Sequence, residues 1–170
     1  MPAVAMTDHG NLYGAISFYK ACHAAGVKPI MGCEIYLAPE SIEKREEIPG
    51  RKRACHVTLL AENNVGWVNL QKLVSKGHLE GMWYGKPRVD REILREYSEG
   101  IICLSGCISG PINEWILQDQ EDHAWETAQE LLDIYGKENL YLEIHNHGME
   151  QQAKIRDSLV KFTEQMDIKL

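Results

Sequence analysis

The sequence lacks the features of several protein classes. It contains no apolar run close to the roughly 20 residues that a membrane-spanning helix needs, and no basic region precedes an apolar stretch at its start. Its five cysteines are an odd number without a CxxC pair, which indicates neither a disulfide framework nor a zinc ribbon. We therefore expect a cytoplasmic protein with reduced thiols and no membrane partner.

The sequence also lacks an excess of positive charge. Its formal net charge is -7, with 18 Lys and Arg against 25 Asp and Glu. A broad nucleic-acid-binding face is therefore excluded, because nonspecific affinity comes mainly from Lys and Arg at phosphates. Any DNA contact must be local or bridged by metal, and clustered carboxylates and imidazoles tolerate one another best around a cation.

What the sequence does contain is typical of one α/β domain with a largely parallel sheet. Its 170 residues are 44% hydrophobic, and β-rich apolar runs alternate with stretches of helical periodicity. The predicted strands are Ala3–Thr7, Ile30–Leu37, Val57–Ala61, Ile101–Ser105 and Leu140–Ile144. The predicted helices are Leu12–Ala25, Val65–Ser75, Arg91–Tyr97, Ile112–Leu117, His123–Tyr135 and Glu150–Met166. Residues 39–54 and 77–89 are predicted to be exposed loops.

Residue types that bind metals recur at the ends or starts of these strands. Asp8 and His9 follow the first strand, where parallel α/β folds place their ligand sites, although an Asp and a Gly also suit a simple turn. Glu34 lies inside an apolar strand, and a buried carboxylate needs either a metal or a basic partner. His56 opens the third strand and could equally be a hydrogen-bonded histidine. Cys107 follows the fourth strand and could bind zinc as a thiolate or be an ordinary packed cysteine.

Two further segments carry polar side chains that could support a site. Glu143 and His145 share a face by the two-residue period of a strand, and His147 follows; an exposed turn explains the same residues. Lys86 and Arg88 lie in the aromatic and glycine-rich segment 81–88, which could stack a base and hold a phosphate. A solvated loop that tucks in one aromatic ring is the alternative.

Six segments in order along the chain carry a resemblance to a known family. They are PAVAMTDHGNLYGA (2–15), KPIMGCEIYLAP (28–39), HVTLLAEN (56–63), KPR (86–88), LSGC (104–107) and YLEI (141–144). This series resembles the PHP (polymerase and histidinol phosphatase) domain of bacterial DNA polymerase III alpha subunits. The resemblance implies part of a distorted (βα)7 TIM-like barrel, a single PHP domain fragment over residues 1–170. It lacks the family's first-strand His-x-His and last-strand Asp-x-His segments.

The resemblance also implies roles for the residues above. The metal ligands would be His9, Glu34, His56 and Cys107, and the catalytic group Asp8, His9 and Glu34. Four residues could hydrogen-bond the metal ligands without binding metal themselves: Asp8, Glu143, His145 and His147. Phosphate or DNA could contact Lys86 and Arg88. The cofactors would be divalent metals, zinc or manganese with magnesium possible by ligand type.

The implied function of the intact protein is a metal-dependent 3′-to-5′ exonuclease that proofreads beside a DNA-directed DNA polymerase. Polymerase chemistry would depend on residues outside these 170. Expected partners are DNA, a proofreading exonuclease subunit and other replicase subunits. Two alternatives are a non-catalytic module that docks a proofreading exonuclease and a small-molecule phosphoesterase similar to histidinol phosphatase.

Overall fold

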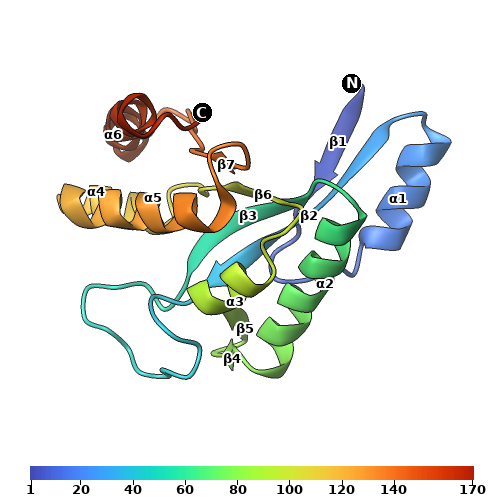
Figure 1. Ribbon diagram of the computed structural model, residues 1–170, viewed down its shortest axis with the longest axis horizontal. Coiled ribbons are helices and arrows are strands. Elements are labelled where there is room, and N and C mark those ends of the chain that lie inside the picture. The colour runs from blue at the N-terminus through green and yellow to red at the C-terminus, as the bar shows by residue number, and fades with distance from the viewer.

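One mixed sheet flanked by six helices makes up the computed structural model, which describes residues 1–170. The strands are β1 (Ala3–Met6), β2 (Lys28–Leu37), β3 (Cys55–Ala61), β4 (Met82–Trp83), β5 (Lys86–Val89), β6 (Ile101–Leu104) and β7 (Leu140–Tyr141). The helices are α1 (Ala15–Ala24), α2 (Asn64–Leu79), α3 (Arg91–Glu96), α4 (Pro111–Leu117), α5 (Glu121–Tyr135) and α6 (Glu150–Met166). The strands lie between α1 and α2 on one side and α4 to α6 on the other (Figure 1).

The fold combines α-helices with a β-sheet, as predicted, but the prediction that the sheet is largely parallel is wrong. Its strand order is β4-β5-β2-β3-β6-β7, with β1 also paired to β2. The pairs β1–β2, β2–β5 and β6–β7 are parallel, whereas β2–β3, β3–β6 and β4–β5 are antiparallel. The reason is the connection over residues 38–54, which contains no helix: a parallel neighbour usually needs a helical crossover, and β3 instead returns beside β2. The sheet does not close into a barrel.

All six predicted helices are present; α6 has the predicted bounds, and the other five differ at one or both ends. Two of them begin where the side chain of a capping residue accepts a backbone N–H: Asn63 bonds Gly66 before α2, and Asp90 bonds Ile93 before α3. The predicted loop over residues 77–89 is wrong, because α2 continues to Leu79 and β4 and β5 then form a hairpin. The predicted fifth strand is too long, since β7 ends at Tyr141.

The two faces of the sheet differ in burial, and this difference places the site. On one face the alternate residues of β2 and β3 are buried, as Cys33, Val57 and Leu59 show with 0% exposure. They belong to one core cluster with residues of α2, α5 and α6. On the other face, side chains such as Glu34 and His56 are only partly covered. None of the helices is both long enough and apolar enough to cross a membrane.

Candidate metal centre

Three predicted ligands meet on the partly covered face of the sheet. His9 lies three residues after the end of β1, Glu34 lies in β2 and His56 lies in β3. The parallel β1–β2 register continues as a bridge between His9 and Glu34, and the antiparallel β2–β3 register places His56 opposite Tyr36. One ligand atom from each of the three residues lies within 4.8 Å of the other two. We call His9, Glu34 and His56 the triad.

Hydrogen bonding leaves the triad ready to accept a cation. His56 Nδ1 lies 2.7 Å from Glu34 Oε1, and His9 Nδ1 lies 3.5 Å from the same oxygen. An ionised carboxylate only accepts hydrogen bonds, so neutral His56 donates from Nδ1 and keeps the lone pair of Nε2 free. A histidine oriented in this way by a carboxylate is the usual form of a metal-binding imidazole.

The local electrostatics keep His56 in its metal-binding form. Burial lowers the pKa of His56, and this effect outweighs the opposing influence of Glu34; His9 and Lys86 nearby lower the pKa further. The imidazole therefore stays neutral, as a ligand must. Two imidazoles and a carboxylate form a donor set that suits zinc or manganese. His9 is the open side of the triad, since 55% of its side chain is exposed against 20% for His56.

The backbone of the β1–α1 loop is held tightly against β2. Gly10 N–H donates to Glu34 O at 2.9 Å, and Glu34 N–H donates to Asp8 O at 3.0 Å. Gly10 has φ +63°, and a Cβ there would lie 2.8 Å from the ring of Pro87, so only glycine fits without strain. The exposed Asp8 side chain does not join the triad. Asp8 contributes its carbonyl instead, which also accepts from the Cys33 thiol at 3.2 Å.

Cys107 is not among the three residues whose ligand atoms lie within 4.8 Å of one another, and its role as a fourth ligand stays a prediction. It lies after β6 and lines a small pocket together with Asn113, Glu143 and His145. Glu143 and His145 do interact, with 2.7 Å between Oε1 and Nε2, while Glu143 Oε2 is buried and has no hydrogen-bond partner. His147 is exposed beside the ring of His145. These side chains lie beyond the end of β6, and the loop that carries Cys107 contacts the backbone of His56, where His56 N–H donates to Ser109 O at 2.9 Å.

The two predicted phosphate contacts have different surroundings. Arg88 is 1% exposed, and its guanidinium donates to the backbone carbonyls of Ile42, Lys44 and Gly81. These bonds argue against Arg88 as a phosphate contact, because its donors are already bonded to backbone carbonyls. Lys86 is partly exposed, and its Nζ lies 5.1 Å from the centroid of the Tyr36 ring.

Two residues of the site were missed from the sequence. Tyr36 lies beside the triad histidines, with its ring centroid 6.2 Å from that of His9 and 5.0 Å from that of His56. The two-residue period from Glu34 along β2 could have identified it. His78 of α2 donates from Nε2 to Gly10 O at 2.8 Å and so fixes the loop that carries His9. No local pattern indicates this contact, because the two residues are 68 positions apart.

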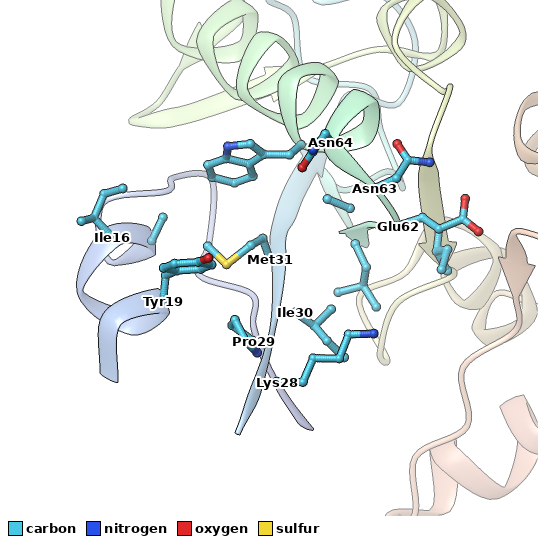
Figure 2. Close-up of a pocket in the computed structure, with 14 residues that line it drawn as sticks. Ile16, Tyr19, Lys28, Pro29, Ile30, Met31, Glu62, Asn63 and Asn64 are labelled. Carbon is cyan, nitrogen blue, oxygen red and sulfur yellow. The ribbon is translucent and has the colours of Figure 1, made fainter. Parts of the chain in front are cut away.

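A large apolar pocket lies away from the triad. It has a volume of about 570 Å³ and lies between α1, the start of β2 and the end of β3 (Figure 2). Ile16 and Tyr19 of α1 and Met31 of β2 line it, and most of its other lining residues are also hydrophobic. Ile16 is 66% exposed and Tyr19 48% exposed. The pocket is an uncovered apolar surface rather than a place for acid and base chemistry.

Comparison with known proteins agrees with this arrangement. The PHP domain family matches residues 1–147. The chain is 42% identical over 168 residues to the DNA polymerase III subunit alpha of Treponema pallidum, and 49% identical over 162 residues to that of Thermus aquaticus. It covers 14% and 13% of these relatives, which cover 99% and 95% of the chain. The chain thus spans about one seventh of their length, and it belongs to the PHP domain family.

Proposed function

We propose that the triad is part of a metal-dependent phosphodiesterase site, a 3′-to-5′ exonuclease in a replicative DNA polymerase III alpha subunit. One observation carries the proposal: His9, Glu34 and His56 come from three different elements and bring their ligand atoms within 4.8 Å of one another. The relatives named DNA polymerase III subunit alpha supply the polymerase context.

Each residue would have a distinct task. His9 and His56 would hold divalent zinc or manganese through their imidazole nitrogens, and Glu34 would orient His56 or bind the metal itself. In such sites bound divalent cations activate water and stabilise charge on the scissile phosphate. Lys86 would bind a phosphate oxygen of the substrate, because its ammonium lies at the edge of the triad beside Tyr36. Cys107 would bind metal only if its loop and the triad share a wider centre.

We further propose that the intact domain extends this sheet into the (βα)7 barrel of the family. Three observations support this: β1 is paired on one side only, a parallel bridge links Tyr141 to Lys169 beyond β7, and the apolar pocket at α1 is uncovered. The further strands would supply the missing His-x-His and Asp-x-His ligands. DNA and the other replicase subunits, including a proofreading exonuclease, would contact the protein mainly outside these residues.

The experiment compares the full-length protein with its His9→Ala variant. Bound metal is measured by elemental analysis, and release of nucleotides from a mispaired primer is followed with dNTPs absent. We expect His9→Ala to lose metal and to reduce nucleotide release by at least about 100-fold, the contribution typical of a removed catalytic group. Primer extension on a matched template should remain, because polymerisation would use other residues.

The matched control is His23→Ala, which removes an exposed histidine of α1 outside the triad. It should leave both metal content and nucleotide release unchanged. Equal nucleotide release by the wild type and His9→Ala would refute the exonuclease assignment. If the wild-type protein binds metal but releases no nucleotides, the domain is a structural module.

A further inference from the structure

The tip of the β4–β5 hairpin carries an aromatic residue where the backbone does not favour one. Tyr84 and Gly85 form the turn between Trp83 and Lys86, with φ +47° and +73°. Two-residue turns with positive φ at both positions strongly prefer Asn, Asp or Gly, and a bulky residue there is strained. Tyr84 is nevertheless 68% exposed, so burial in the core does not offset the strain.

The neighbouring side chains explain what an exposed ring could do there. Trp83 is the aromatic ring that packs inward, over the guanidinium of buried Arg88 at 4.4 Å. Tyr84 stays outside, and the guanidinium carbon of Arg53 lies 4.3 Å from its ring centroid. Arg53 is half exposed, and its pairing with Glu47 leaves it at the surface. The tip therefore presents one aromatic ring and one guanidinium to solvent.

The hairpin is also fixed beside the triad. Pro87 packs against Gly10, the residue after His9, so closely that a Cβ there would clash with its ring. Lys86 sits over the ring of Tyr36, which in turn contacts both triad histidines. Lys86 follows Tyr84 by two residues, on the other side of the turn, where it pairs with Trp83. A cation and a stacking surface thus follow one another outward from the triad.

We propose that Tyr84 and Lys86 form a binding surface for the single-stranded 3′ end of a nucleic acid, with Lys86 on a backbone phosphate and Tyr84 stacked on a base. This inference rests on the proposed function, since it assumes that the triad acts on a phosphodiester bond. Base stacking on an aromatic ring accepts any sequence, as an enzyme that trims strand ends requires. The surface is local, which is compatible with the net charge of -7.

The test uses the full-length protein, a single-stranded oligothymidylate with photoreactive thymidines in its last three positions, and a chelator that prevents cleavage. Cross-links are mapped by mass spectrometry to separate the hairpin from DNA bound elsewhere. We expect cross-links on residues 82–88, and their loss in Tyr84→Asn. With metal restored, KM for nucleotide release should rise by about 5- to 150-fold in Tyr84→Asn, with kcat changed far less.

The free energy of unfolding distinguishes a binding role of Tyr84 from a structural one. If Tyr84 were structural, its replacement would lower the stability of the fold. Asn tolerates positive φ better than Tyr, so Tyr84→Asn should fold at least as stably as the wild type while it binds DNA more weakly. Tyr84→Phe keeps the ring and should recover most of the cross-linking. Tyr19→Asn, which removes a half-exposed tyrosine of α1, is the control for binding and should change neither the cross-linking of residues 82–88 nor KM.

Two outcomes would overturn the inference. One is an unchanged KM in Tyr84→Asn while His9→Ala abolishes nucleotide release. In that case the hairpin inference fails and the proposed function of the triad stands. The other is an oligothymidylate that cross-links elsewhere but never to the hairpin. If the wild type releases no nucleotides, the proposed function fails, and cross-linking in chelator still decides whether the hairpin binds a strand.

Discussion

The loop that carries Cys107 is held by one buried amide, and its removal should be costly. Asn113 of α4 is 1% exposed, and its Nδ2 donates to Gly106 O at 3.2 Å and to Cys107 O at 2.7 Å. Cys107 O also accepts from Gly110 N–H, whereas Gly106 O has no other hydrogen-bond partner. Asn113→Leu therefore leaves one buried carbonyl unsatisfied and weakens a second.

The size of the effect follows from these contacts. An unsatisfied buried carbonyl costs about 1–3 kcal/mol, and one further lost hydrogen bond costs about 1 kcal/mol. Part of this loss is offset, because Asn113 Oδ1 is itself buried without a partner and disappears in the variant. We expect Asn113→Leu to reduce the free energy of unfolding by about 2 kcal/mol, or roughly 30-fold in the equilibrium constant.

Urea unfolding of the chain measures this loss, and thiol alkylation shows where it acts. Cys107 is the one cysteine that is not buried, so its alkylation rate reports on its own loop. The rate should rise in Asn113→Leu. It should stay unchanged in Asn69→Leu, a control that removes a similar buried amide whose Nδ2 bonds Glu99 O at 2.9 Å. A loss below about 0.5 kcal/mol with unchanged alkylation of Cys107 would refute the reasoning.

Three further predictions concern the triad's surroundings. Arg88→Met should lower the free energy of unfolding by about 2 kcal/mol and the melting temperature by about 4–8 °C, because the buried Ile42 O and the partly buried Lys44 O lose their guanidinium donor; an unchanged melting temperature would contradict this. Gly10→Ala should destabilise the fold by at least about 1 kcal/mol through its positive φ and its clash with Pro87, as calorimetry would show. The pKa of His56 is lowered in the folded protein, so below about pH 6.5 the unfolded chain binds a proton more readily than the folded one. The metal-free protein should therefore lose stability as the pH falls below this value. Urea titrations at several pH values should show this loss, and His56→Gln should remove it.

The ligand types could be predicted from the sequence because buried strands tolerate few polar residues. Glu34 stands out in β2 for this reason, and His9 follows β1 at the edge where parallel strands place their sites. His56 fitted that scheme poorly, since it precedes its strand. The antiparallel direction of β3 resolves the difficulty: the beginning of an antiparallel strand lies beside the end of its neighbour, so His56 reaches the same edge as His9.

Other parts of the fold depend on contacts that local patterns do not encode. The hairpin β4–β5 has strands of two and four residues, too short for an alternating pattern to appear. Arg88 looks like a surface cation by type, and only the carbonyls of the distant segment 42–44 make it an interior residue. The sheet's direction could have been anticipated, because the helix-free connection over residues 38–54 argues against a parallel crossover.

The alternation of β2 separates stability from chemistry. Cys33 and Ile35 point into the core, and burial raises the pKa of the Cys33 thiol to about 12, so this sulfur stays a neutral packing group. Glu34 and Tyr36 alternate with them and point to the partly covered face. A one-residue shift of β2 against β3 would exchange the two sets, placing a carboxylate in the core and a thiol at the triad. The cost of burying that carboxylate is therefore one reason why the register that builds the triad is also the register that folds.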